Sequence, residues 1–168
     1  MAKEAFRGEV TQKVDSKARV SIPAAFRRIL ESEDTLTEET PRTRLYMIYG
    51  GKKRNFVECY SREGADILAA QIESMELGSL DRERAERDLI ARSVMVDIEP
   101  DGRIVLPVKV REKMGFAEDD LKSGAEAVFV GVANRFKLYR KDVYEAVEDD
   151  DEDDVDPLAR VGRNVKVS

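Results

Sequence analysis

Polar and apolar residues alternate in two similar stretches of the chain, one around residue 20 and the other around residue 104. The apolar positions are Val14, Val20 and Ile22 in the first stretch and Ile98, Ile104 and Leu106 in the second. Their two-residue spacing is typical of strands that bury one face. A polar turn divides each stretch and a proline ends it, because proline stops a strand and suits the start of a helix. Each stretch therefore predicts two short strands around a turn, followed by a helix.

The two stretches match at one constant offset of 84 residues. The matching pairs include Arg19 with Arg103, Pro23 with Pro107 and Arg27 with Arg111. A pattern that recurs at a fixed spacing indicates that one structural unit is used twice. We therefore expect an α+β protein with two related units.

The rest of the pattern extends both units. We expect strands at residues 8–14, 19–23, 45–49, 55–60, 94–98, 103–107, 127–130 and 136–139, helices at 24–31, 61–77, 82–92, 108–114 and from 142, and loops at 32–43 and 117–125. Ser61 and Asp81 are the expected N-caps of the two middle helices. The expected divisions are a first domain at 5–60, a helical connection at 61–93, a second domain at 94–147 and an acidic tail at 148–168.

The formal net charge of −6 is unevenly distributed. Residues 148–168 carry eight acids against three bases, whereas residues 1–28 carry seven bases against three acids. The basic end of the chain coincides with the first turn, which favours contact with an anionic partner. The acidic tail is expected to be disordered, because its adjacent like charges repel and no apolar residues compensate.

Composition argues against an enzyme. The chain has no histidine, which excludes Ser-His-Asp and Cys-His nucleophile arrangements and most metal sites. Its single cysteine, Cys59, can form no internal disulfide and is expected to be a small core residue. We find no catalytic, metal or cofactor constellation, no secretory segment and no membrane-length apolar run, so we expect a cytoplasmic protein without a small-molecule substrate.

Three motifs carry a resemblance to a known family. They are Phe6-Arg7-Gly8, Asp15-Ser16-Lys17-Ala18-Arg19 with Ile22-Pro23, and Asp101-Gly102-Arg103 with Leu106-Pro107. In this order, and with a helical middle, the chain resembles the MraZ family of bacterial transcriptional regulators. The resemblance implies two AbrB-like swapped-hairpin repeats that form a small β-barrel with a pseudo-two-fold axis and peripheral helices.

The same resemblance implies a function. Similar proteins assemble into ring-shaped homo-oligomers and bind double-stranded DNA through the first hairpin of each protomer. Their target is a set of short G-rich direct repeats upstream of their own division and cell-wall operon. The DNA-contacting positions carried over to this chain are Lys17 and Arg19, and Arg7 in the Phe-Arg-Gly start is a second candidate. We accordingly expect a nucleoid-associated regulator.

The chemistry of these side chains agrees with that expectation. An arginine fork can donate to both O6 and N7 of guanine in the major groove, whereas lysines such as Lys13 and Lys17 can hold phosphates. The alternative for Arg19 is an ion pair with Asp15. For Arg103, which is surrounded by acids, we expect a salt bridge within or between protomers.

Several further alternatives stay open in the sequence. Ala18 stands where the family has glycine, so a positive φ at that site costs about 1 kcal/mol unless the turn is of another type. Arg27 and Arg28 contact either phosphate or solvent, and residues 52–54 are expected to form a solvated basic hairpin tip. The acidic tail competes with DNA for the basic turn. In the alternative function, an oligomeric interaction module without DNA readout, it docks a basic partner.

Overall fold

The structure, a computed structural model, describes residues 3–149 and 156–162 of the 168-residue chain. Its strands are β1 (Glu9–Val14), β2 (Arg19–Ser21), β3 (Arg44–Ile48), β4 (Val57–Tyr60), β5 (Ser93–Asp97), β6 (Arg103–Val105), β7 (Ala125–Gly131) and β8 (Phe136–Arg140). Its α-helices are α1 (Ala24–Ser32), α2 (Arg62–Glu73), α3 (Leu80–Ala85), α4 (Val108–Met114), α5 (Glu118–Ser123) and α6 (Lys141–Asp149). This α+β content and the eight strands agree with the sequence-based expectation.

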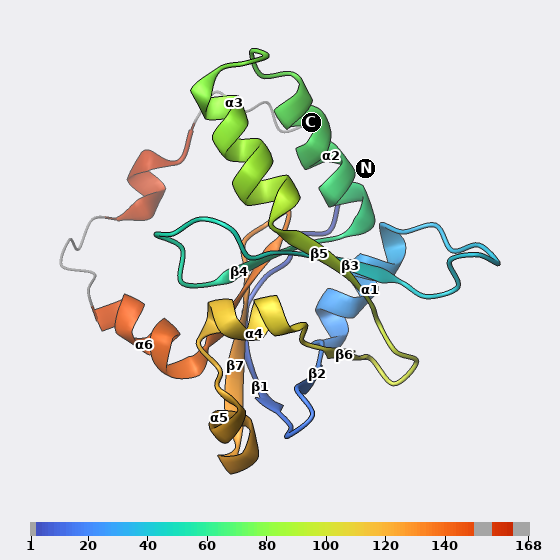
Figure 1. The fold of residues 1–168 in the computed structure, drawn as a ribbon, viewed down its shortest axis with the longest axis vertical. Helices are drawn as coiled ribbons and strands as arrows, with labels where there is room; N and C mark the ends of the chain where they lie inside the picture. Colours follow the sequence, from blue (N-terminus) through green and yellow to red (C-terminus); the bar gives the residue numbers. More distant parts are fainter. Residues whose placement is uncertain (1–2, 150–155, 163–168) are drawn as a thin grey trace.

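One antiparallel sheet holds all eight strands in the order β5-β3-β4-β8-β7-β1-β2-β6, and it curls into a nearly closed barrel (Figure 1). The first strand of each half pairs with a strand of the other half: β1 pairs with β7, and β5 pairs with β3. The hairpins β3–β4 and β7–β8 meet through β4 and β8. The two halves of the chain therefore share one sheet.

Strands β2 and β6 pair so that residues 84 positions apart in the sequence, the offset of the repeat, face each other. Val20 lies directly opposite Ile104, its counterpart 84 residues later. The N–H of Ile22 donates to the carbonyl of Gly102 at 3.0 Å, and the N–H of Leu106 donates to the carbonyl of Ala18 at 2.9 Å. These two hydrogen bonds are reciprocal, so each turn is attached to the strand that follows the other turn.

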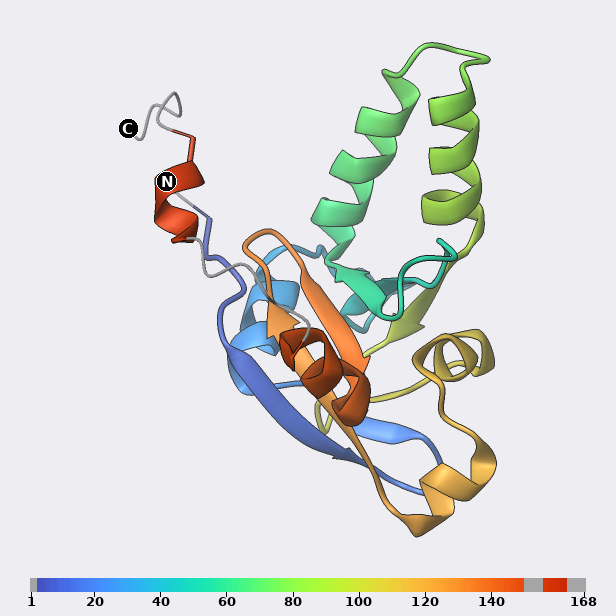
Figure 2. The same cartoon turned by 90° about the vertical axis from the view of Figure 1, so that its left-hand side faces the viewer.

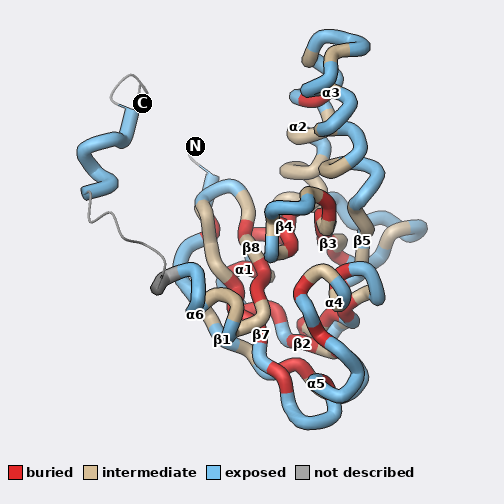
Figure 3. Tube along the Cα trace, turned by 60° about the vertical axis from the view of Figure 1, so that its left-hand side comes forward, coloured by how far each residue is buried: buried red, intermediate tan, exposed pale blue. Residues whose placement is uncertain are grey.

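The barrel interior is a continuous apolar core with residues from both halves (Figure 3). Four phenylalanines lie at its centre, with ring centroids 5.1 to 6.4 Å apart: Phe6, Phe26, Phe129 and Phe136. Burial of each such ring contributes about 1.5–3 kcal/mol, which makes this cluster a main source of stability. Cys59 is fully buried in the same core, as the sequence predicts.

Three details differ from the sequence-based expectation. Residues 117–125, expected to be a loop, contain α5, because the Asp120 carboxylate accepts from the N–H of Ala117 and the side chain of Leu121 is buried. The N-cap of α3 is Ser79 rather than Asp81, since its hydroxyl accepts from the N–H of Arg82 at 3.2 Å. The first middle helix ends at Glu73, four residues short of the expected end.

Helix α2, α3 and a π-helical continuation of α3 (Glu86–Ala91) form a helical hairpin that projects from the barrel (Figure 2). None of the helices within residues 3–149 and 156–162 combines the length and apolarity that crossing a bilayer requires. Of the acidic tail, residues 150–155 and 163–168 lie outside the described residues, so the expectation of disorder stays a prediction there. Pro157–Arg160 forms a short 3-10 helix that Asp156 caps.

Candidate nucleic-acid interface

The turn between β1 and β2 is organised by Asp15. Its Oδ1 accepts from the backbone N–H groups of Lys17 at 2.9 Å and Arg19 at 2.8 Å, and its carbonyl accepts from the N–H of Ala18 at 2.9 Å. Ala18 has a φ of 62°, the left-handed conformation that glycine adopts at least cost. The positive φ expected from the family's glycine is thus present with alanine in its place.

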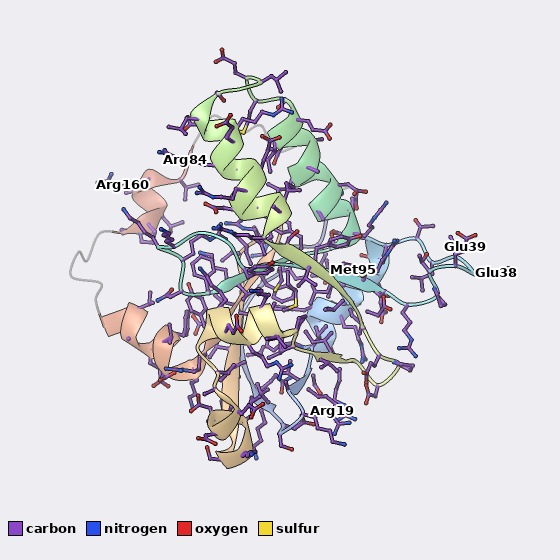
Figure 4. The ribbon with its side chains drawn as sticks, in the orientation of Figure 1. Arg19, Glu38, Glu39, Arg84, Met95 and Arg160 are labelled. Carbon is purple, nitrogen blue, oxygen red and sulfur yellow. The ribbon has the colours of Figure 1, made fainter. Side chains whose placement is uncertain are left out.

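Arg19 is held at this turn by the same carboxylate. Its Nε donates to Oδ2 of Asp15 at 2.7 Å, and about a third of each side chain is exposed. Burial acts to raise the pKa of Asp15, but hydrogen bonds from Arg19 and Lys17 outweigh it and hold that pKa below its ordinary value. The structure records no hydrogen bond from Nη1 or Nη2 of Arg19 within the described chain. Asp15 therefore orients the guanidinium through Nε and leaves its two terminal nitrogens without a recorded acceptor. Arg19 projects from the turn in Figure 4.

The four predicted DNA-contacting residues are exposed or half-exposed, but they do not form one cluster. Lys17 lies in the turn beside Arg19, and Lys13 lies on the outer face of β1, opposite Glu126 of β7. Arg7 precedes β1 at the opposite end of that strand, where Phe6 bridges Ala133. Seven residues, six of them in β1, separate it from Asp15, a span of about 26 Å. The turn therefore unites only Lys17 and Arg19.

The second turn, between β5 and β6, has the same pattern of backbone hydrogen bonds as the first turn, but acidic residues replace its lysines. Counting 84 residues on, Lys13 becomes Asp97 and Lys17 becomes Asp101, while the arginine is kept as Arg103. Nε of Arg103 donates to Oδ2 of Asp101 at 2.7 Å, and Nη1 lies 4.0 Å from Oδ2 of Asp15. The salt bridge expected for Arg103 is confirmed, and it lies within the protomer.

Arg27 has a structural role that sequence reasoning does not anticipate. Gly102 of the second turn has a φ of 84°, and a Cβ built there would overlap Nη1 of Arg27. Arg27 also lies 3.7 Å from Glu31 on its own helix. Its guanidinium is thus packed across the second turn. This position matches neither of the two expectations for Arg27, which were contact with phosphate and contact with solvent alone.

A second group of cations, which sequence reasoning missed, lies around the β3–β4 loop. We call it the basic cluster; its members are Lys52, Lys53, Arg54, Lys113, Arg135 and Lys137. The expected solvated tip is correct for exposed Lys52 and Lys53 but wrong for Arg54. Arg54 is half-buried because it and Arg135 both pair with the buried carboxylate of Glu58. No sequence signal predicted the basic cluster, because its members come from three separate segments of the chain: residues 52–54, Lys113 and residues 135–137.

The described residues hold no group of three or more His, Cys, Asp or Glu side chains arranged to bind a metal ion. Burial raises the pKa of the Cys59 thiol far above its ordinary value, so this sulfur is a poor nucleophile. The surface features with chemical interest are therefore the first turn and the basic cluster.

Comparison with known proteins identifies relatives of the whole fold. No protein-family model matches the chain. A protein of Cereibacter sphaeroides (strain KD131 / KCTC 12085) named Transcriptional regulator MraZ is 45% identical over 143 residues, which cover 85% of this chain and 84% of the relative. The protein of the same name from Ruegeria sp. (strain TM1040) is 38% identical over 161 residues, covering 91% and 92%. The one from Thermoanaerobacter sp. (strain X514) is 28% identical over 138 residues, covering 82% of each chain. With this identity over most of its length, the chain belongs to the MraZ family.

Proposed function

We propose that this protein is a DNA-binding transcriptional regulator that reads short G-rich direct repeats upstream of its own division and cell-wall operon. The observation that carries the proposal is the geometry of Arg19. Its Nε is fixed by Asp15 at 2.7 Å while its terminal nitrogens remain available. A guanidinium presented in this way can donate to O6 and N7 of one guanine, the commonest specific contact in the major groove.

The neighbouring cations have a different role. Lys17 and Lys13 are exposed on the turn and on β1, where their ammonium groups can hold backbone phosphates and set the register. Arg7 precedes β1 at the end of the strand opposite the turn, so it contacts a different phosphate, one that the residues of the turn do not reach. The acidic residues of the second turn would repel DNA phosphates, so each protomer contacts DNA bases through the first turn alone.

We infer that the two halves, residues 5–60 and 94–147, are AbrB-like swapped-hairpin repeats about a pseudo-two-fold axis, joined by the helices of 61–93. The exchanged pairing of β1 with β7 and of β5 with β3 supports this, as do the reciprocal hydrogen bonds between the turns. One turn neutralises few phosphates, so its own affinity is modest. A ring of protomers that meets several repeats gains affinity through effective concentration.

Binding to upstream DNA tests this function. The full chain is titrated onto a labelled duplex from the region upstream of its own gene and onto the same duplex with the repeats scrambled, at several salt concentrations. We expect the repeat duplex to bind about 10³-fold more tightly or better, and both affinities to fall as salt rises. Equal affinities for the two duplexes would reject sequence-specific readout. An absence of binding, both by the full chain and by a chain ended at Val147, would favour the interaction module.

A further inference from the structure

The basic cluster carries more positive charge than its own surroundings balance. Both Arg54 and Arg135 contact the carboxylate of Glu58. The other nearby acid, Asp88, acts on Arg54 and Lys113 but is itself paired with two further arginines, Arg87 and Arg92. Burial, followed by the charges of Arg135 and Arg54, lowers the pKa of Lys137. Burial also lowers the pKa of Lys113, and the nearby charge of Arg54 adds to this effect. Such repulsion among cations creates a local positive potential that an acidic partner would relieve.

Contacts with an aromatic ring and with the backbone hold the side chains of the basic cluster in place. Cζ of Arg54 lies 5.0 Å from the ring centroid of Phe56, and Nζ of Lys137 lies 4.5 Å from the same centroid. Lys113 donates to the carbonyl of Gly51 and so ties the β3–β4 loop to α4. The exposed lysines of this loop, Lys52 and Lys53, have no recorded ion pair within the described chain. The loop is therefore a braced basic surface with two unpaired ammonium groups.

An acidic counterpart lies in the loop between α1 and β3. Glu38 and Glu39 are exposed at its tip, and neither has a recorded ion pair within residues 3–149 and 156–162. The tip has its own hydrogen bonds: the N–H of Thr37 donates to the carbonyl of Thr40 at 3.1 Å, and the N–H of Thr40 donates to Oγ1 of Thr37 at 3.0 Å. Leu36 beside it is half-exposed. This loop is thus a preorganised acidic projection.

The two loops leave the molecule on opposite sides. In Figure 1 the β3–β4 loop points to the left and the loop between α1 and β3 points to the right. Figure 4 shows Glu38 and Glu39 at the outer end of the second loop. One chain cannot bring these surfaces together, whereas a second copy placed beside the first can. A contact between different surfaces of identical chains is head-to-tail, and its repetition closes a ring or extends a chain.

We propose that the acidic tip of one protomer, Glu38 and Glu39, docks against the basic cluster of the next protomer at Lys52 and Lys53. This contact rests on the ring assembly proposed above and supplies its polarity, with Leu36 and the half-buried Phe56 as apolar neighbours on the two sides. Charge pairs of this kind mainly select the partner and the register of an interface. Reversal of charge on one side therefore makes like charges meet, and reversal on both sides restores the pairing.

Complementary charge reversal tests the proposal. The mass of the full chain in solution is measured by light scattering after size exclusion, at about 50 mM and about 500 mM salt. We expect the wild type to assemble. The variants Glu38→Lys with Glu39→Lys, and Lys52→Glu with Lys53→Glu, should each shift to smaller species at low salt, and the combined four-residue variant should assemble again. The matched control, Glu73→Lys with Glu76→Lys on exposed positions of the helical hairpin, should assemble like the wild type. Circular dichroism checks that each variant is folded.

The possible failures are distinct. A wild type that is monomeric at both salt concentrations overturns the ring assembly and this contact with it. An assembling wild type whose two reversed variants assemble equally well overturns this contact and leaves the ring assembly standing. If the lysine reversal weakens DNA binding but leaves the assembly unchanged, the basic cluster is a phosphate contact and the docking proposal is wrong.

Discussion

Oδ2 of Asp15 in the first turn lies 4.0 Å from Nη1 of Arg103 in the second. The same oxygen accepts from Nε of Arg19 at 2.7 Å, while Oδ1 holds the turn backbone. Partly exposed ion pairs contribute little to folding, about 0–1 kcal/mol. We therefore infer that the main role of Asp15 is to orient the side chain of Arg19. Loss of the Asp15 carboxylate should affect DNA recognition more than the stability of the fold.

The variant Asp15→Asn tests this assignment. The amide oxygen can still accept from the turn backbone, but the amide N–H₂ cannot accept from Nε of Arg19. We expect affinity for scrambled DNA to rise slightly, because one negative charge is lost, while the preference for the repeat duplex falls about tenfold or more. Titration of both duplexes measures the ratio. An unchanged ratio would show that Asp15 does not orient the reading arginine.

Substitutions of Arg19 separate its charge from its shape. Arg19→Lys keeps the charge but loses the fork, so we expect loss of most of the specificity, about 10- to 100-fold, with little change in salt dependence. Arg19→Ala should remove specific binding and leave the assembly intact. Arg84→Ala, an exposed arginine on the helical hairpin, is the matched control and should bind like the wild type. Unchanged binding by both Arg19 variants would refute the site.

The sequence predicted the two strand-turn-strand-helix units, the hairpins that follow them and the apolar core positions. The spacing of apolar residues over a few positions is enough to predict a strand or a helix, and the repeat supported each of these predictions a second time. The pairing of Arg103 with Asp101 was also predictable, since the two residues are neighbours in one turn. Helix α5 was missed because it is only six residues long and buries one apolar side chain, Leu121, while Asp120 satisfies the backbone at its start.

The basic cluster and the role of Arg27 could not be predicted for a different reason. Arg54 meets Arg135 only because β4 pairs with β8, and Arg27 meets Gly102 only because β2 pairs with β6. Pairing between distant strands has no signature in a single sequence. The first turn was singled out because its motif resembles that of a known family and because the segment around it, residues 1–28, is basic.

The second turn provides a test of backbone strain and packing together. Gly102→Ala places an L-residue at a φ of 84°, which costs about 1–2 kcal/mol, and its methyl group meets the guanidinium of Arg27. We expect the free energy of unfolding, measured by urea titration, to fall by at least this amount. In an Arg27→Ala background the same change should cost only the backbone strain. Equal costs in the two backgrounds would mean that Arg27 moves away freely.

Asp34 provides a pH-dependent test of the base of the acidic loop. Its side chain is fully buried, and it accepts from Nε and Nη2 of Arg44 at 3.2 and 2.5 Å, and from the backbone N–H of Arg44 at 2.9 Å. Burial acts to raise the pKa of Asp34, but the hydrogen bonds from Arg44 outweigh it and lower that pKa. The carboxylate therefore stabilises the fold above its unfolded pKa of about 3.9, and this contribution is lost as the pH falls through the lowered folded value.

We expect Asp34→Asn to reduce the free energy of unfolding by about 1–3 kcal/mol at pH 7, because the amide cannot replace the charged hydrogen bonds to Arg44. The difference from the wild type should persist at pH 5 and shrink below about pH 4, where the carboxyl group begins to protonate in the unfolded wild-type chain while the folded carboxylate is still charged. Urea unfolding at pH 7, 5, 4 and 3 measures it. Glu76→Gln, at an exposed position of the helical hairpin, is the control and should match the wild type throughout. A difference that stays constant across this range would mean that the Asp34 charge does not stabilise the loop.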